Sequence, residues 1–254
     1  MSSFNRKPTI ISIEGNIGTG KSTILANLKI RMDDVMPGNK ILFLKEPVDI
    51  WESIKDEHGH TILEKFYRDQ KRYAFTFQVM AYISRLSLLK RAIKENPDCE
   101  IIIIERSLIA DKNIFMQMLY DDGQVEMMEF EIYNRWYREF IDEYRVDSIV
   151  YLDSDPEICS ERINRRNRNG EEGIPLSYLR KCRDYHKRWL VDTKIENSDK
   201  EISEHAESYK INHDGYDYSV LRINSNSNVE YPDSLSNEWL KGIQQFIEDM
   251  RVIQ

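Results

Sequence analysis

The stretch that decides the fold is TIISIEGNIGTGKST, at residues 9–23. Its first half is a β-branched apolar run, typical of a buried strand, and a helical pattern of apolar residues follows it. Between them, residues 15–22 match the spacing G-x-x-x-x-G-K-[ST] of a phosphate-binding loop. In such a loop, backbone N–H groups and the start of a helix surround phosphate oxygens. The sequence therefore predicts a nucleoside triphosphate site built by the loop residues Gly15, Asn16, Ile17, Gly18, Thr19, Gly20, Lys21, Ser22 and Thr23.

Length and composition narrow the class of protein. The chain has 254 residues, which suits one domain with a sizeable core. Its net charge of −8 argues against non-specific binding to nucleic acid or to an anionic membrane. No apolar run approaches the roughly 18 residues of a membrane span, and the polar N-terminus resembles neither a signal peptide nor a presequence. The three cysteines are scattered. We therefore expect a cytoplasmic protein without membrane or nucleic-acid partners.

Further apolar runs predict the rest of the sheet. Strands are expected at 40–44, 101–104, 148–152 and 219–223, in addition to the strand of the phosphate loop. Helical patterns separate them, so a five-stranded parallel sheet flanked by helices follows. Residues 194–217 are polar and show little periodicity, which indicates a surface excursion.

Charged residues follow two of these strands. Glu46 comes after the second strand, and Glu105 and Arg106 come after the third. In open α/β sheets ligands bind outside the carboxyl ends of the strands, so all three are placed as site residues. Glu105 can hold Mg²⁺ and Arg106 can neutralise phosphate charge. Position alone does not decide whether Glu46 is a site residue or an ordinary carboxylate at the end of a strand.

Two helical segments carry unusual patterns. Residues 73–94 are apolar around much of the helix, except on a stripe formed by Gln78, Ala81 and Arg85. The stripe either lines a cavity or forms a solvent-facing edge. Residues 112–145 are rich in methionine and aromatic residues, which can form core or the face of a homodimer.

An arginine cluster stands out in this acidic chain. Four arginines lie within residues 162–168, and a Gly-rich stretch follows them. A solvated helix face and a nucleic-acid contact are alternatives. A lid over about 162–173 that closes on transferring phosphates fits the phosphate loop best.

Taken together, these motifs resemble the cellular-type deoxyribonucleoside kinases, which include deoxycytidine, deoxyguanosine and insect multisubstrate members. The resemblance rests on GNIGTGKST at 15–23, EPV with a following Trp at 46–51, FYRDQKRYAFTFQ at 66–78, ERS with a following Asp at 105–111, and RINRRNRNGEEGIPLSYL at 162–179.

The resemblance implies a P-loop kinase fold with an arginine-rich lid, as a single domain over residues 1–254. It implies phosphoryl transfer from ATP, or another nucleoside triphosphate, to the 5′-hydroxyl of a deoxynucleoside in nucleotide salvage. In this reading Glu46 is the general base, and Ser22 and Glu105 hold Mg²⁺. Arg106 contacts the transferring phosphate. The remaining phosphate contacts come from Lys21, Arg162, Arg166 and Arg168.

The resemblance also assigns the nucleoside contacts. Tyr67 and Glu171 would bond the sugar 3′-hydroxyl, although Glu172 is an alternative to Glu171. Tyr67 would also crowd a 2′-substituent and favour deoxyribose. Gln78 would hydrogen-bond to the edge of the base. Trp51 and Phe115 would form the apolar walls of the base pocket.

Base preference follows from Arg85 and Asp111. In the family this pair accompanies cytosine or purine substrates, and a carboxylate held by arginine can accept a hydrogen bond from an exocyclic amine. We therefore expect deoxycytidine and purine deoxynucleosides to be used, and thymidine poorly.

Two alternatives compete with this reading. A nucleoside monophosphate kinase, such as a thymidylate kinase, would need extra basic groups for the phosphate of its acceptor. A non-catalytic, kinase-like assembly subunit would tend to lose the catalytic residues, which this chain retains.

Overall fold

The computed structural model describes residues 7–35, 40–168, 170–171, 173–196 and 198–252. In this part of the chain, one sheet has the strand order β2-β3-β1-β4-β7-β6-β5. The strands are β1 (Thr9–Gly15), β2 (Ile41–Leu44), β3 (Ile101–Glu105), β4 (Ser148–Asp153), β5 (Lys200–Ser203), β6 (Ala206–His213) and β7 (Tyr216–Asn224).

The five predicted strands form the parallel part of this sheet. β2, β3, β1, β4 and β7 pair in parallel, in that spatial order. The all-isoleucine run of β3 is buried along its whole length, as a strand covered on both faces requires. The parallel α/β architecture is therefore confirmed, and β1 with its phosphate loop lies between β3 and β4.

The prediction that residues 194–217 form a plain surface excursion was wrong. The segment contributes β5 and β6, which extend the sheet antiparallel to β7. Tyr209 and Ile211 are buried and alternate with exposed polar neighbours, so a strand pattern is present but obscured by charge. Asp214 and Gly215 form the turn into β7 with φ angles of 50° and 81°, the backbone conformation that a tight two-residue hairpin needs.

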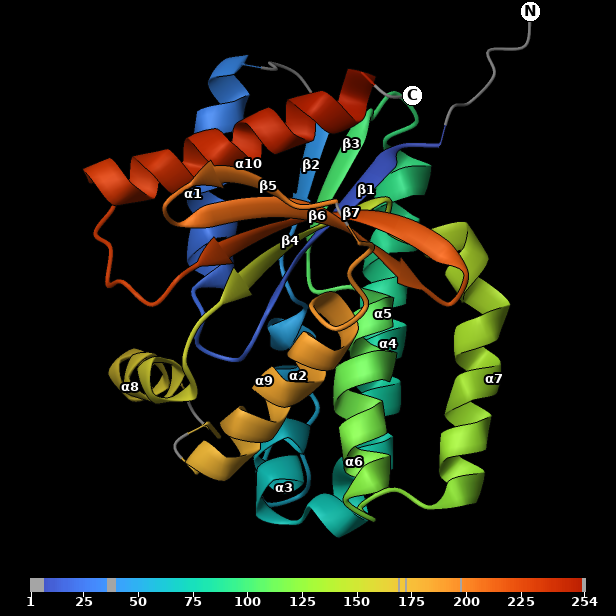
Figure 1. Cartoon of the computed structure of the whole chain (residues 1–254). Coiled ribbons are helices and arrows are strands. Elements are labelled where there is room, and N and C mark those ends of the chain that lie inside the picture. Colours follow the sequence, from blue (N-terminus) through green and yellow to red (C-terminus); the bar gives the residue numbers. More distant parts are fainter. Residues whose placement is uncertain (1–6, 36–39, 169, 172, 197, 253–254) are drawn as a thin grey trace, which may run out of the picture.

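Helices cover both faces of the sheet (Figure 1). Ile11 and Ile13 of β1 pack with α1 and α10 on one face, whereas Ile10 joins the core under α4, α7 and α9 on the other. Among the described helices, none combines the length and apolar character needed to cross a membrane. The helices are α1 (Lys21–Val35), α2 (Val48–Ser53), α3 (Ile62–Arg68), α4 (Gln70–Glu95), α5 (Leu108–Ala110), the π-helix η1 (Asp111–Met116), α6 (Gln117–Asp121), α7 (Met127–Tyr144), α8 (Pro156–Arg166), α9 (Leu176–Leu190) and α10 (Ser234–Val252).

Candidate active site

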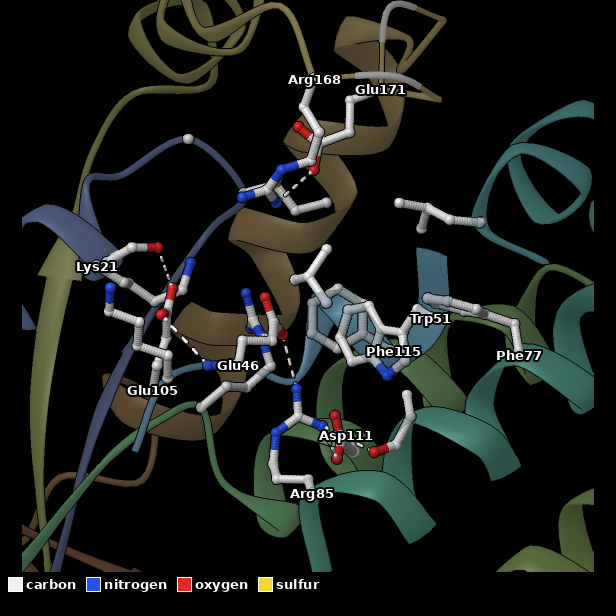
Figure 2. Close-up of a pocket in the computed structure, with 18 of the residues that line it drawn as sticks. Lys21, Glu46, Trp51, Phe77, Arg85, Glu105, Asp111, Phe115, Arg168 and Glu171 are labelled. Carbon is white, nitrogen blue, oxygen red and sulfur yellow. Dashed lines mark hydrogen bonds and ion pairs between the residues drawn. The ribbon is translucent and has the colours of Figure 1, made fainter. Parts of the chain in front are cut away.

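A cavity of about 400 Å³ opens where the phosphate loop meets the ends of β2 and β3 and the inner faces of α4 and η1 (Figure 2). Most of the predicted site residues line it. They are Ile17, Gly18, Gly20, Lys21, Ser22, Thr23, Glu46, Trp51, Tyr67, Gln78, Arg85, Glu105, Arg106, Asp111, Phe115, Arg166, Arg168 and Glu171.

The phosphate loop is shaped by close backbone contacts. A Cβ atom at Gly15 would lie 2.6 Å from the carbonyl oxygen of Leu152, and φ of Gly15 is 144°. Only glycine fits there without a shift of the neighbouring strand. The ammonium of Lys21 donates to the carbonyl oxygens of Gly15 (3.1 Å) and Asn16 (2.7 Å). Burial lowers the pKa of Lys21 to about 8.

Ser22 and Glu105 form the candidate metal end of the cavity. Ser22 Oγ donates to Glu105 Oε1 over 2.6 Å, and the backbone N–H of Glu46 faces Glu105 Oε2 at 3.5 Å. Within the described ranges, no three His, Cys, Asp or Glu side chains gather into a cluster that could hold a metal on their own. One hydroxyl and one carboxylate are nonetheless the hard oxygen donors that Mg²⁺ takes from a protein when phosphates supply the rest. The donor set therefore fits Mg²⁺.

Glu46 faces the cavity between two arginines. Its Oε1 atom lies 2.7 Å from Arg85 Nη2 and 3.3 Å from Arg106 Nε. Burial alone would raise the pKa of Glu46, but the two guanidiniums outweigh burial and hold this pKa below its usual range. Glu46 is therefore ionised at neutral pH and can accept a hydrogen bond from a hydroxyl group.

Arg106 has an unusual backbone. Its φ angle is 67°, in the left-handed region that residues other than glycine rarely occupy. Its guanidinium donates to the carbonyl oxygen of Gly15 (3.2 Å) and lies over the ring of Phe115, 4.5 Å from the centroid. Such strain persists where surrounding contacts enforce it, and it concentrates at functional sites. The turn after β3 thereby directs a cation toward the phosphate loop.

The stripe on α4 faces the cavity rather than solvent. Gln78 is 2% exposed, and Arg85 Nη1 donates to Asp111 Oδ2 over 2.6 Å. Burial raises the pKa of Asp111 to about 6, against the opposing effect of Arg85. Trp51 forms the facing wall, and its indole N–H donates to Ser84 Oγ (2.9 Å). Figure 2 shows the rings of Trp51, Phe77 and Phe115 close together at this end of the cavity, with Arg85 and Asp111 near them.

The lid residues Arg166, Arg168 and Glu171 line the cavity, and Figure 2 shows Arg168 and Glu171 on the side away from Arg85 and Asp111. Arg166 and Arg168 both pair with this carboxylate, Arg168 at 3.2 Å. Burial raises the pKa of the Tyr67 phenol, and the nearby Glu171 adds to the effect. Tyr67 is therefore a neutral hydrogen-bonding group beside the carboxyl group of Glu171. Glu172, the alternative to Glu171, lies outside the described residues.

Four predicted residues do not line the cavity. Gly15, Asn16 and Thr19 form the underside of the loop, and the Asn16 side chain donates to the carbonyl oxygen of Leu179 (2.7 Å). Arg162 lies beside the loop, where its Nη1 donates to the carbonyl oxygen of Thr19 at 3.5 Å. Its guanidinium donates to the carbonyl oxygen of Ser227 (2.7 Å) in the segment that follows β7. In this conformation Arg162 therefore differs from Arg166 and Arg168.

Sequence reasoning missed several aromatic and apolar members of the cavity. Phe77 packs edge-on against Trp51, with centroids 5.5 Å apart, and Tyr178 packs edge-on against Tyr67 at 6.2 Å. Their apolar and aromatic character gave no signal, since core residues look the same. The missed apolar and aromatic lining residues are Val48, Leu63, Phe66, Phe77 and Tyr178, and two exposed charged residues, Lys45 and Asp49, were missed as well.

Comparison with known proteins gives the family. A family model described as deoxynucleoside kinase matches residues 11–247. A probable deoxycytidine kinase of fowlpox virus is 31% identical over 245 residues, which cover 95% of this chain and 89% of that protein. Human deoxycytidine kinase is 36% identical over 203 residues, which cover 71% and 75%. Mitochondrial deoxyguanosine kinase of Xenopus laevis is 32% identical over 205 residues, which cover 74% and 75%. The resemblance seen in the motifs is thus confirmed along nearly the whole chain, which belongs to the deoxynucleoside kinase family of phosphotransferases.

Proposed function

We propose that this enzyme transfers the γ-phosphoryl group of ATP to the 5′-hydroxyl of deoxycytidine or a purine deoxynucleoside, and so serves nucleotide salvage. One observation carries the choice of substrate. Arg85 lies between Asp111 and Glu46 in the cavity that also contains the phosphate loop. A nucleoside whose exocyclic amine bonds to Asp111 would therefore lie next to Glu46, the carboxylate that takes the proton of the 5′-hydroxyl.

The chemical step needs a base and charge neutralisation. Glu46 accepts the proton of the 5′-hydroxyl while the oxygen forms its bond to the γ-phosphorus. The bond from that phosphorus to the bridging oxygen breaks, and its electron pair leaves with the diphosphate. Lys21 and Arg106 face this path and stabilise the charge that develops on the phosphoryl oxygens. Arg166 and Arg168 extend from the lid to the same cavity.

Ser22 and Glu105 would hold Mg²⁺ at the donor end. When bound, the ion neutralises phosphate charge in this class of reaction. The hydrogen bond between the two side chains already places both oxygens at one point of the cavity wall. Replacing either Ser22 or Glu105 should therefore weaken Mg²⁺ binding more than nucleoside binding.

Nucleoside selection would come from the end of the cavity opposite Ser22 and Glu105. Tyr67 and Glu171 would bond the sugar, and Gln78 would bond the base edge between Trp51 and Phe115. In support, all five residues line the same cavity. The cation at the base end, Arg85, is already shared between two carboxylates. This arrangement disfavours an acceptor that brings its own phosphate, as a monophosphate kinase requires.

A homodimer through the long helices is part of this proposal. Met128, Ile132 and Trp136 follow one another at helical spacing on α7 and are 69%, 49% and 53% exposed. Ile83 of the neighbouring α4 is 46% exposed. An apolar stripe across two packed helices is the kind of surface that association covers.

We further propose that the enzyme acts in the cytoplasm without nucleic-acid or membrane partners, in keeping with its net charge of −8.

The decisive experiment measures phosphorylation of the four natural deoxynucleosides, dCMP and dTMP, with ATP and with UTP as donors. We expect product from deoxycytidine and at least one purine deoxynucleoside, and little from thymidine. Phosphorylation of dCMP or dTMP without any deoxynucleoside would identify a monophosphate kinase instead. No transfer to any acceptor would favour a non-catalytic assembly subunit.

A further inference from the structure

The π-helix η1 carries two residues of the base end. Asp111 and Phe115 lie in this single wide turn, and both line the cavity. π-Turns are rare, and they occur mostly as single turns inside α-helices, frequently at functional sites. Contacts from the surrounding fold hold η1 on both of its sides. On the inner side, Ile114 and Met116 supply such contacts, since both are fully buried.

The outer side of η1 is held by a different part of the chain. Asn113 Nδ2 donates to His213 Nε2 over 2.6 Å, and the Lys112 ammonium pairs with Asp214 at 3.1 Å. Burial lowers the pKa of His213, so the ring is neutral at neutral pH and Nε2 can accept this bond. The ring also packs edge-on against Trp189 of α9. The two contacts fall on the two residues that immediately follow Asp111.

The β6–β7 turn that makes these contacts is itself firmly anchored. Asp214 and Gly215 form a tight turn with positive φ angles. The Tyr216 hydroxyl donates to Asp142 of α7 over 3.2 Å, and the Arg145 guanidinium lies 3.5 Å from the centroid of the Tyr216 ring. The hairpin extends from the sheet toward α7 (Figure 1). It therefore offers η1 a support fixed at several points.

We infer that His213 and Asp214 are positioning residues for base recognition, which hold η1 in the conformation that presents Asp111 to the base. The inference rests on the proposed function, because it assigns Asp111 to the exocyclic amine of the substrate. Neither residue touches the substrate. They act through Asn113 and Lys112, and thereby make base preference depend on a hairpin outside the parallel part of the sheet.

The test replaces both contacts without disturbing the hairpin. His213→Phe keeps a ring against Trp189 but removes the acceptor. Asp214→Asn removes the charge and keeps Asn-Gly, a pair favoured in this turn. The matched control is Asp217→Asn, which removes one charge from the same hairpin at a residue bonded to Asn212 (2.6 Å). Steady-state kinetics with deoxycytidine and thymidine are measured for each protein, together with thermal unfolding.

In the double variant we expect KM for deoxycytidine to rise about fivefold, the scale of losing two partly exposed contacts. Because thymidine has no exocyclic amine, its kinetic constants should change by less than about twofold, and so should kcat for deoxycytidine. Asp214→Asn alone should give about a twofold rise in KM for deoxycytidine, and it keeps the test available if the double variant does not fold.

Three results would overturn the inference. These are an unchanged ratio of deoxycytidine to thymidine efficiency in the double variant, an equal loss for both nucleosides, and a shift of the same size in Asp217→Asn. The proposed function is judged separately, on the wild-type enzyme. If the wild type phosphorylates no deoxynucleoside, the function fails. If it does and the ratio is unmoved by the variants, only the positioning role fails.

Discussion

Arg85 donates a hydrogen bond to Glu46, with Nη2 2.7 Å from Oε1. The same guanidinium holds Asp111 through Nη1 at 2.6 Å. The residue predicted to support base recognition therefore also touches the residue proposed as the general base. Binding of the nucleobase and the orientation of Glu46 are therefore coupled through one planar guanidinium that hydrogen-bonds to both carboxylates.

Replacing Arg85 with Met and Asp111 with Ala should raise the efficiency ratio of thymidine to deoxycytidine by about tenfold, since the group that accepts from the exocyclic amine is lost. Turnover should fall for both nucleosides, because Glu46 loses one of its two arginine partners. Competition assays with both nucleosides measure the ratio directly. A ratio equal to that of the wild type would remove the pair from base selection.

Glu46→Gln should lower kcat about 10²-fold or more, because the amide cannot take the proton of the 5′-hydroxyl. Binding of deoxycytidine, measured by calorimetry, should stay within about threefold of the wild type. Asp49→Asn is the matched control, since Asp49 lines the same cavity from an exposed position. Turnover close to wild type in Glu46→Gln would exclude Glu46 as the base.

The pKa of Asp111, raised to about 6 by burial, predicts a nucleoside-specific pH dependence. Above pH 6 the group is ionised in the free enzyme and accepts hydrogen bonds. As the pH falls through 6 it gains a proton and loses that capacity, so kcat/KM for deoxycytidine should fall relative to thymidine. The ratio of the two profiles between pH 5 and 8 isolates Asp111 from groups that affect both substrates. Asp111→Asn should flatten this ratio, and a persistent slope in that variant would assign the effect elsewhere.

Lys21→Met should abolish transfer and weaken ATP binding, because the ammonium beside the loop carbonyls is the phosphate-binding cation of the motif. Deoxycytidine affinity should be preserved, since Lys21 lies at the donor end. Lys45→Met, at an exposed residue that also lines the cavity, serves as the control and should retain activity. Equal loss of nucleoside and ATP binding in Lys21→Met would point to a disrupted fold instead.

Trp136→Glu should shift the protein from dimer to monomer in sedimentation velocity, because it places a charge in the exposed apolar stripe of α7. The residue is 53% exposed, so thermal stability of the isolated chain should change little. Arg138→Glu, elsewhere on the exposed surface of the same helix, is the control. If the wild type sediments as a monomer at micromolar concentration, the stripe has another role.

Local patterns allowed the sequence by itself to determine the phosphate loop, the parallel strands and the strand-end residues Glu46, Glu105 and Arg106. Glycine spacing and continuous apolar runs are signals of single segments, and parallel pairing brings the ends of such strands to one edge. The family resemblance then extended this reading to the sugar and base contacts.

Only the tertiary structure decided the rest. The bond between Arg85 and Glu46, the bond from Arg162 to Ser227 and the aromatic wall at Phe77 depend on segments far apart in the chain. The hairpin in the 194–217 segment was missed because its period-2 pattern is weak, and strand formation there depends on an available edge of β7. Long-range packing, which no single segment encodes, sets those contacts.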